Sequence, residues 1–349
     1  IKDKIVLVTG AGGSIGSELC RQVLNLKPKV LILFEMNELA LYKIDKELLS
    51  CNKSKIEIYP VLGNVNNSKR LNKVFKYFNV DTVYHTAAYK HVPIVEFNNA
   101  EGVDNNIFGT LSCAQAAIKN KIKTFVLIST DKAVRPTNTM GATKRTSELI
   151  LQALAKTQTI TKFTMVRFGN VLDSSGSVIP LFKEQINNGG PLTVTDRNVI
   201  RYFMTISEAV ELVIQAGAMG TGGDVFILDM GEPVSIDDLA KKMIKLSGLE
   251  LRDELNPNGD IEIKYIGLRP GEKLYEELLV GDDCTKTNNP LIMRAEEEMI
   301  LWEDLKPLLD SLKKEVIDCD QEKIRMILAE LVPGFKPQTD IVDILYKKN

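Results

Sequence analysis

The sequence predicts an α/β protein built on a doubly wound parallel sheet, with a smaller α/β domain toward the C-terminus. Short apolar runs alternate with amphipathic helical segments through the first half of the chain. A glycine-rich turn joins the first run to the first helix. After Gly169 the pattern becomes irregular, and the 349 residues suffice for two domains.

The apolar runs are continuous rather than alternating, which is typical of strands buried on both faces of a parallel sheet. Helical segments such as residues 71–78 and 111–118 separate them, and right-handed crossovers then wind the sheet in both directions. The expected strands cover residues 5–8, 30–34, 56–61, 82–85, 125–128, 163–168 and 225–228.

Shorter elements follow in the second half. A strand is expected at 192–195, and a helix at 207–219 with Ser207 as N-cap and Glu208 in its first turn. Next come a capped helix at 235–247, a strand at 261–266, a helix at 272–279 and a helical tail at 303–331 interrupted near Asp318. The acidic run 296–298 predicts a solvated face.

These elements predict two domains. Residues 1–170, completed by about 200–234, form a dinucleotide-binding Rossmann domain. Residues 171–199 and 235–349 form the smaller domain.

Composition excludes several classes of protein. A net charge of -2 gives no basic footprint for nucleic acid or an anionic membrane. Five widely spaced cysteines and two histidines predict neither disulfides nor a metal site. The sequence contains no run of about 18 consecutive apolar residues, so it predicts no membrane span. We therefore expect a cytoplasmic location. Because the chain begins with Ile1 and not with methionine, it could also be the cytoplasmic soluble domain of a membrane-anchored protein.

The glycine-rich turn predicts a dinucleotide site. Gly10, Gly13 and Gly16 allow a tight turn, an approach of pyrophosphate to backbone N–H groups, and close packing of helix on strand. Glu35 ends the second apolar run, where a carboxylate accepts ribose hydroxyls and repels a 2′-phosphate. We predict NAD rather than NADP; the simpler alternatives are a structural turn and a surface glutamate.

Three longer motifs carry a family resemblance. They are TAAYKHVP at 86–93, STDKAVRPTNTMGATKR at 129–145 and GLRPGEK at 267–273. Together they resemble the UDP-N-acetylglucosamine (UDP-GlcNAc) 4,6-dehydratases of the extended short-chain dehydrogenase/reductase superfamily. Met140 stands where most relatives place tyrosine, four residues before Lys144, which resembles the configuration-retaining branch that serves bacterial glycan and polysaccharide synthesis.

The resemblance implies NAD-dependent conversion of UDP-GlcNAc to UDP-2-acetamido-2,6-dideoxy-α-D-xylo-hexos-4-ulose. Hydride leaves C4, water is eliminated across C5 and C6, and hydride returns to C6. Since the Met140 thioether cannot move a proton, Thr130, Asp131 and Lys132 are the expected proton handlers. Asp131 is assigned as acid at C6, Lys132 as base at C5 and Thr130 as the contact to the C4 oxygen, while Lys144 holds the ribose.

The same resemblance gives two sets of binding residues. Asn64 stands where the family has aspartate, and Asp173 where it has glycine. The cofactor set is Gly10, Gly13, Ser14, Ile15, Gly16, Glu35, Asn64, Val65, Ala87, Ala88, Lys90, Asn106 and Lys144. The substrate set is Lys90, His91, Asn170, Val178, Thr193, Val194, Arg201, Arg269 and Glu272.

Other functions stay open at this point. A C5-inverting dehydratase or a 4-epimerase would use the same fold, although an epimerase has no need of the Asp131–Lys132 pair. Loss of the tyrosine also fits a non-catalytic NAD-binding scaffold. We expect a homo-oligomer, because residues 144–155 carry an apolar stripe that is either a pairing face or part of the core.

Overall fold

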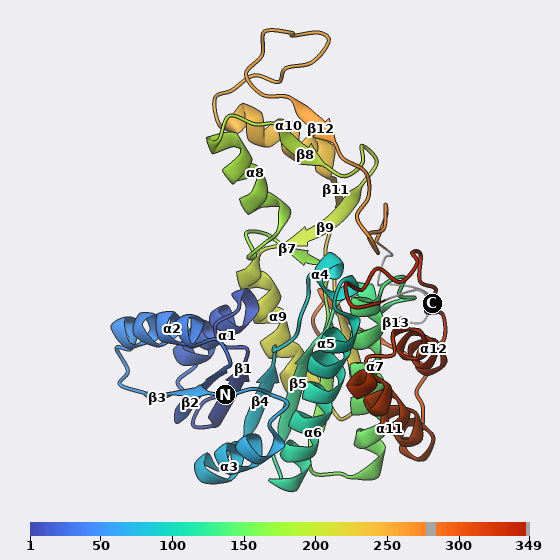
Figure 1. Ribbon diagram of the computed structural model, residues 1–349. Helices are drawn as coiled ribbons and strands as arrows, with labels where there is room; N and C mark the ends of the chain where they lie inside the picture. Colours follow the sequence, from blue (N-terminus) through green and yellow to red (C-terminus); the bar gives the residue numbers. More distant parts are fainter. Residues whose placement is uncertain (277–283, 347–349) are drawn as a thin grey trace.

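A nine-stranded sheet forms the centre of the larger part of the molecule (Figure 1). The computed structural model describes residues 1–276 and 284–346. The strand order is β13-β14-β10-β6-β5-β4-β1-β2-β3, parallel from β10 to β3 and antiparallel at β13 and β14. This confirms the predicted doubly wound sheet. The strands are β1 (Ile5–Thr9), β2 (Val30–Glu35), β3 (Glu57–Leu62), β4 (Thr82–His85), β5 (Thr124–Ile128), β6 (Lys162–Arg167), β10 (Asp224–Leu228), β13 (Cys284–Lys286) and β14 (Ile292–Ala295).

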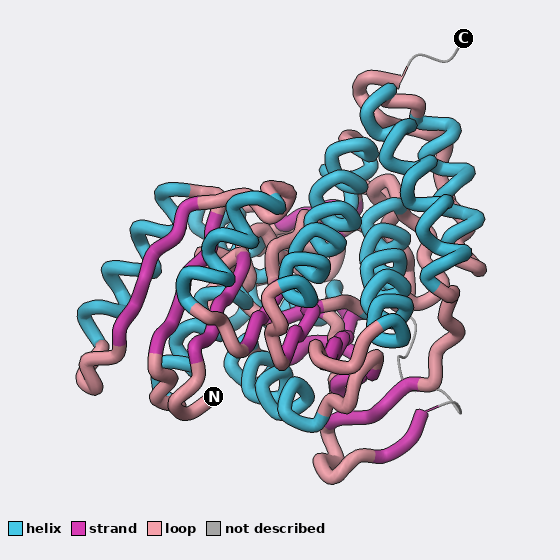
Figure 2. Tube along the Cα trace, turned by 90° about the horizontal axis from the view of Figure 1, so that it is seen from below, coloured by secondary structure: helices cyan, strands magenta, loops and turns pink. Residues whose placement is uncertain are grey.

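Helices cover both faces of this sheet, as Figure 2 shows from below. One face packs on α1 (Ser14–Asn25), α2 (Glu38–Cys51) and α9 (Ile206–Met219). The other packs on α3 (Ser68–Phe78), α6 (Gly109–Lys119) and α7 (Thr139–Thr157). The residues of the inner strands, such as β1, β2 and β4, are therefore buried on both sides, which explains their continuous apolar pattern. The edge strand β3 is mostly exposed.

The C-terminal helices α11 (Trp302–Asp318) and α12 (Gln321–Leu331) lie over α7. Cys319 has a φ of 53° between them, and Asp320 caps α12 by accepting from the Lys323 N–H, which confirms the predicted break. Because α7 is buried from Thr139 to Leu154, the apolar stripe at 144–155 faces the core of this chain. The stripe therefore does not support a pairing face, and the homo-oligomer stays a prediction.

The smaller lobe rises above the sheet edge in Figure 1. Its core contains Phe182, Leu192, Ile244 and Ile261. A three-stranded sheet contains β7 (Asn170–Val171), β9 (Ile200–Met204) and β11 (Pro233–Ser235), and a two-stranded sheet contains β8 (Leu192–Val194) and β12 (Ile263–Tyr265). Its helices are α8 (Val178–Asn187) and α10 (Ile236–Leu246).

The division into two domains stays a prediction, but two segments lie elsewhere than expected. Strand β9 joins the small sheet rather than completing the large one. Residues 284–331 join the larger body: β14 pairs with β10, and Leu309 enters the core around α7.

Three local predictions are wrong. Thr205, not Ser207, caps α9, because Thr205 and Glu208 form a reciprocal capping box and Ser207 already lies in the first turn. Residues 272–276 are not helical; the Glu272 carboxylate instead accepts from the Arg269 N–H, and residues 277–279 lie outside the described part of the chain. Glu297 is not solvated with its neighbours but pairs with Arg167.

Short helices complete the fold at the carboxyl edge of the sheet. They are α4 (Val92–Glu96), α5 (Asn99–Val103), the π-helix η1 (Asp104–Phe108) and the 3-10 turn η2 (Asp131–Ala133). Among the described residues, no helix combines the length and apolarity needed to cross a membrane.

The contribution of the packing of α11 on α7 to the free energy of unfolding can be measured. Leu309 is 2% exposed, so Leu309→Ala leaves a cavity and should lower the free energy of unfolding by about 2–5 kcal/mol. Ile317 of the same helix is 71% exposed, and Ile317→Ala should stay within about 0.5 kcal/mol of the parent. Urea unfolding of both variants checks this, and equal effects would contradict the packing.

Candidate active site

The site is built where the carboxyl ends of β1, β4, β5 and β6 meet. Strand β1 lies between β2 and β4, so the order of winding reverses there. Ligands of doubly wound sheets bind at such reversal points. The predicted residues from the glycine turn and from segments 86–91, 129–132 and 168–170 follow these strand ends.

The glycine turn has the geometry of a dinucleotide loop. Gly10 has a φ of +65°, and a Cβ there would lie 2.8 Å from the Thr86 hydroxyl. A Cβ on Gly16 would lie 2.0 Å from the Gly10 carbonyl oxygen, so both glycines are required for packing. Gly13 differs, because its Cβ would meet protein only at 3.4 Å, and it begins α1 without a side-chain cap. The first turn of α1 is thus open to an anion.

Glu35 is held firmly beside this turn. One carboxylate oxygen accepts from the Gly12 N–H at 3.0 Å, and the other accepts from the N–H groups of Met36 and Asn37 at 2.9 Å. Asn64 is exposed after β3, with its amide oxygen accepting from the Asn66 N–H at 2.8 Å. Val65 is buried against the space left by Gly109.

Asn106 lies in the π-helix η1 and fixes the segment that carries Ala87, Ala88 and Lys90. Its amide oxygen accepts from the Tyr89 N–H at 2.8 Å, and its amide nitrogen donates to the Tyr89 carbonyl at 3.0 Å. The same nitrogen donates to Thr143 of α7 at 3.0 Å. π-Helical turns are frequent at functional sites. Here the turn joins the segment after β4 to α7.

His85 is a structural histidine that sequence reasoning did not single out. The Thr110 hydroxyl donates to the Asn106 carbonyl, so it must accept from His85 Nε2, at 3.1 Å. His85 Nδ1 is then an acceptor and receives the Thr9 hydroxyl hydrogen at 2.8 Å. Burial, with the charge of Lys144, lowers the pKa of His85 to about 3. The ring is therefore neutral and not a proton carrier at neutral pH.

The turn after β5 gathers the predicted proton handlers. The Thr130 hydroxyl donates to Asp131 Oδ1 at 2.7 Å, and Lys132 Nζ donates to the same oxygen at 3.0 Å. Asp131 is buried, and its Oδ2 has no hydrogen-bond partner among the described residues. A Cβ on Gly169 would lie 3.2 Å from Oδ2, so a side chain at this position would crowd the oxygen.

Glu276 joins this group and was missed from the sequence. Its Oε1 lies 3.3 Å from Lys132 Nζ and 3.6 Å from Arg201 Nε. Burial acts to lower the pKa of Lys132, but the charges of Asp131 and Glu276 outweigh it, and the pKa is raised. The sequence predicted a helix over residues 272–279, which gave no reason to place Glu276 in the site. Residues 272–276 are not helical.

Met140 and Lys144 lie on α7 beside the turn. Met140 is buried, and a Cβ on the next residue, Gly141, would lie 2.2 Å from the Lys132 carbonyl oxygen. Lys144 Nζ donates to the Ile128 carbonyl at 2.6 Å. Burial lowers the pKa of Lys144 to about 8, opposed by the charge of Glu148.

A buried ion network lies beneath the turn, also unforeseen. Glu148 accepts from the Ser129 hydroxyl at 2.6 Å and from Arg167 Nη2 at 2.6 Å. Arg145 Nη1 donates to Glu148 at 3.1 Å, and Arg167 also pairs with Glu297. Burial alone would raise the pKa of Glu148, but Arg167 outweighs it and lowers the pKa to about 2. Ser129 directly precedes Thr130, so this network anchors the turn.

The predicted substrate residues Arg201 and Glu272 contact each other. Arg201 Nη2 lies 3.3 Å from Glu272 and donates to the Lys273 carbonyl at 2.7 Å, while Nη1 donates to the Leu274 carbonyl at 3.0 Å. Arg201 is thus buried and holds segment 272–276 against β9. Arg269 is exposed.

The loop between β7 and α8 lies across the glycine turn. The Ser175 N–H donates to the Ser14 hydroxyl at 3.1 Å. A Cβ on Gly176 would lie 2.6 Å from His91, so the loop also contacts the segment after β4. Asp173 has a φ of 57°, which explains why glycine suits that position.

The remaining substrate residues of this lobe are placed as follows. Asn170 lies in β7, and its amide donates to the Tyr202 carbonyl at 3.4 Å. Val178 is the first residue of α8. The Thr193 N–H donates to Gln185 at 3.0 Å, and the Val194 carbonyl accepts from the Ile266 N–H at 3.0 Å. A role for these backbone groups in reading uracil stays a prediction.

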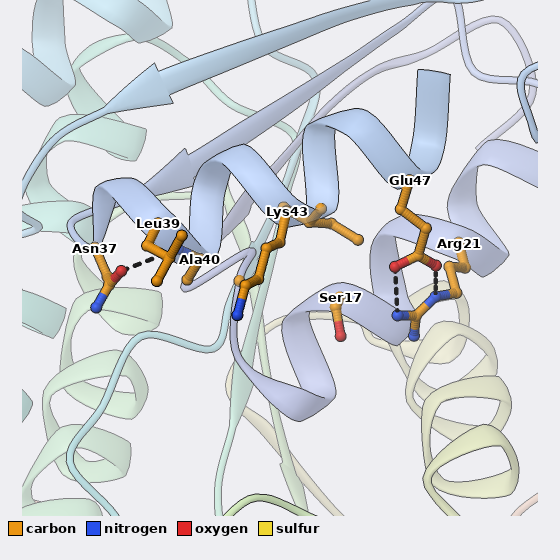
Figure 3. Close-up of a pocket in the computed structure, with 9 residues that line it drawn as sticks. Ser17, Arg21, Asn37, Leu39, Ala40, Lys43 and Glu47 are labelled. Carbon is orange, nitrogen blue, oxygen red and sulfur yellow. Dashed lines mark hydrogen bonds and ion pairs between the residues drawn. The ribbon is translucent and has the colours of Figure 1, made fainter. Parts of the chain in front are cut away.

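A hollow of about 390 Å³ lies between α1 and α2 (Figure 3). Gly12, Asn37 and Lys43 line it, and Arg21 donates to Glu47 at its far end at 2.5 Å. None of the predicted catalytic residues lines this hollow, so we assign it no catalytic role. Over residues 1–276 and 284–346, no group of three potential ligands could hold a metal ion.

Known proteins with related sequences show the family to which this chain belongs. The pattern of the polysaccharide biosynthesis protein family matches residues 6–297. Capsular polysaccharide biosynthesis protein CapD of Staphylococcus aureus is 53% identical over 279 residues, which is 80% of this chain and 45% of CapD. A UDP-glucose 4-epimerase of Rickettsia rickettsii is 35% identical over 295 residues, 82% of this chain and 81% of the epimerase.

Solved structures agree on the fold. Pen from Bacillus thuringiensis superposes with a TM-score of 0.76 at 36% identity, covering 89% of this chain and 98% of Pen. DesIV, a dTDP-glucose 4,6-dehydratase from Streptomyces venezuelae solved with NAD and TYD, gives 0.66 at 21% identity over 77% of this chain and 86% of DesIV. The second likeness concerns the fold alone.

The sheet, the glycine turn and the strand-edge site define a doubly wound Rossmann-type fold, which the chain shares with DesIV. Within that class, the chain belongs to the polysaccharide biosynthesis protein family. It spans about half the length of CapD.

The network under the turn predicts a pH-dependent stability. The folded pKa of Glu148, about 2, lies below its ordinary 4.5, so its stabilisation is present above pH 4.5 and is lost as the pH falls toward 2. Glu148→Gln leaves Arg167 without its main partner and should cost about 3–5 kcal/mol at pH 7. Urea unfolding between pH 2 and 7 should show a smaller acid dependence for the variant than for the parent.

Glu254→Gln, on an exposed loop residue, provides the control and should change stability by less than about 0.5 kcal/mol. If Glu148→Gln matched it, the anchoring role of Glu148 would be disproved.

Proposed function

We propose that this chain catalyses the NAD-dependent 4,6-dehydration of UDP-GlcNAc, with retention at C5, in bacterial glycan or polysaccharide biosynthesis. The observation that carries the proposal is the strand-edge cluster of Thr130, Asp131 and Lys132 beside a buried methionine at position 140. Membership of the polysaccharide biosynthesis family supports it.

The residues present fit NAD. Gly13 and the uncapped first turn of α1 suit its pyrophosphate, and the fixed carboxylate of Glu35 suits the adenosine ribose. We propose that the residues of the predicted cofactor set, including Asn106, Ala88 and Lys144, surround the bound NAD. When bound, NAD supplies the hydride acceptor for C4 and the hydride donor for C6.

The chain's own residues move the protons. Thr130 contacts the C4 oxygen and passes its proton on. Asp131 and Lys132 form the acid–base pair that eliminates water across C5 and C6. Lys144, whose pKa is about 8, remains largely cationic at pH 7 and favours bound anions. Met140 only packs, because a thioether has no proton to give.

The nucleotide sugar is proposed to span from this turn to the smaller lobe. Lys90, His91 and Asn170 border the sugar end of that path. Arg269 is exposed and free to reach a diphosphate, whereas Arg201 and Glu272 would first have to exchange their present protein contacts.

A 4-epimerase is the alternative that one observation favours, namely the 35% identity to the Rickettsia epimerase. Against it, C4 epimerisation needs no acid–base pair at C5 and C6, yet here the buried Asp131 is hydrogen-bonded to the half-buried Lys132. A C5-inverting dehydratase remains a second alternative. A scaffold without activity has no use for an Asp131 Oδ2 that is left without a hydrogen bond to any described residue. The cytoplasmic location also stays a prediction.

One reaction separates these functions. The protein is incubated with UDP-GlcNAc and NAD in deuterated water and followed by proton NMR. We expect a 6-methyl signal and a 4-keto centre, with retained configuration at C5. UDP-GalNAc would indicate an epimerase, inverted C5 the other dehydratase branch, and unchanged substrate a scaffold. Met140→Tyr should not raise the rate; a large gain would contradict the displaced proton route.

The cofactor proposal makes a separate prediction. In Gly13→Ala the new methyl group would lie no closer than 3.4 Å to other protein atoms, so the fold should persist. The same methyl group would stand between the pyrophosphate and the backbone. We expect NAD binding, measured by calorimetry, to weaken about tenfold or more, which is about 1.4 kcal/mol. Gly16→Ala should instead impair folding, because its methyl would lie 2.0 Å from the Gly10 oxygen. Unchanged NAD affinity in Gly13→Ala would contradict the assigned site.

A further inference from the structure

We infer that Glu276 is a positioning residue that holds Lys132 as an ammonium, so that Lys132 acts as the acid at C6 and Asp131 Oδ2 as the base at C5. This reverses the roles expected from the sequence. It rests on the proposed dehydration, and it adds to the site a residue that lies far from Asp131 and Lys132 in the sequence.

The geometry around Lys132 carries the inference. Its Nζ lies between two carboxylates, 3.0 Å from Asp131 Oδ1 and 3.3 Å from Glu276 Oε1. Both carboxylate side chains are 4% exposed, so solvent screens them little. Glu276 is in turn held by Arg201 Nε at 3.6 Å.

The charges facing Lys132 favour its ammonium form. Asp131 acts from its own turn, Glu276 from the segment beside β9, and Arg201 from β9 itself. On α7, the Lys144 ammonium donates to the Ile128 carbonyl. Two anions thus oppose one nearby cation. A base at C5 must be neutral when it is a lysine, and this surrounding disfavours that state.

Asp131 has the complementary arrangement. Its Oδ1 accepts from both Thr130 and Lys132, while Oδ2 is buried and has no hydrogen-bond partner within the described part of the chain. Gly169 lies beside Oδ2, and a side chain there would crowd this oxygen, because its Cβ would lie 3.2 Å away. A desolvated carboxylate oxygen with a free lone pair is a suitable base for an acidified C–H.

The elimination then balances. Asp131 Oδ2 takes the C5 proton of the 4-keto sugar, and the C5–H electrons form the C5=C6 bond. The C6–O bond breaks, and its oxygen takes a proton from Lys132 and leaves as water. Asp131 returns its proton to C5 as C6 is reduced. The proton lost from the C4 hydroxyl replaces the one that Lys132 gave, so the cycle releases water and no net proton.

Retention at C5 follows from this assignment. The group that removes the C5 proton is also the group that returns it, and it is fixed on one face of the sugar by the buried turn. A single stationary base therefore restores the original configuration.

The role of Glu276 is tested with Glu276→Gln, which keeps shape and removes charge. We expect the alkaline limb of the kcat profile to move down by at least one pH unit, so that kcat at the midpoint of the parent's limb falls about fivefold or more, with a smaller change in KM. Glu276→Asp should restore part of the limb. Glu262→Gln, the same change on an exposed glutamate, should leave the profile unchanged. An unmoved limb, or a faster variant at neutral pH, overturns the inference.

The direction of proton transfer is tested by exchange in deuterated water. Recovered UDP-GlcNAc from Lys132→Gln should contain deuterium at C5, because its base remains. Recovered UDP-GlcNAc from Asp131→Asn should not. Exchange in Asp131→Asn alone, or in neither variant, overturns the assignment.

A measurement without substrate separates this inference from the proposed function. In protein with 13C-labelled lysine, the Lys132 Cε signal is assigned by its loss in Lys132→Gln. We expect it to titrate above the ordinary lysine pKa of about 10.4 in the parent and lower in Glu276→Gln. If UDP-GlcNAc is not converted but this shift occurs, the proposed function fails and the hold of Glu276 on Lys132 stands. A parent signal that titrates below pH 9 overturns that hold.

Discussion

The arrangement of the site depends on one buried carboxylate, Glu148. It joins the Ser129 hydroxyl at the end of β5 to Arg167 at the end of β6, and to Arg145 on its own helix. A buried ion pair is stable only when both charges keep their partners, so these strand ends and α7 are tied together. Thr130 and Asp131 follow directly, and their precise placement is a consequence of this tie.

Much of the fold could be predicted from the sequence, because its signals are local. Continuous apolar runs gave the parallel strands, and the glycine spacing located the turn at the reversal point of the sheet. The break near Asp318 was also local, since Asp320 caps the next helix. The error at Ser207 arose because Thr205, two residues earlier, offers the same capping chemistry with a reciprocal glutamate.

The site could be predicted only in part. Thr130, Asp131 and Lys132 adjoin in the sequence, and the structure brings them together. Glu276, Arg201 and Glu297 could not be placed, because their partners lie far away along the chain and no periodic pattern records such contacts. The apolar stripe on α7 was ambiguous for the same reason: only the position of α11 and α12 decides what covers it.

The proposed dehydration requires hydride to leave C4 of the sugar and to return to C6 of the same molecule, although Met140 replaces the usual phenol. The most direct test uses UDP-GlcNAc that carries deuterium at C4 in ordinary water, followed by mass spectrometry and NMR of the product. We predict a single deuterium in the 6-methyl group. Deuterium retained at C4, or a 6-methyl group without deuterium, would rule out this hydride transfer.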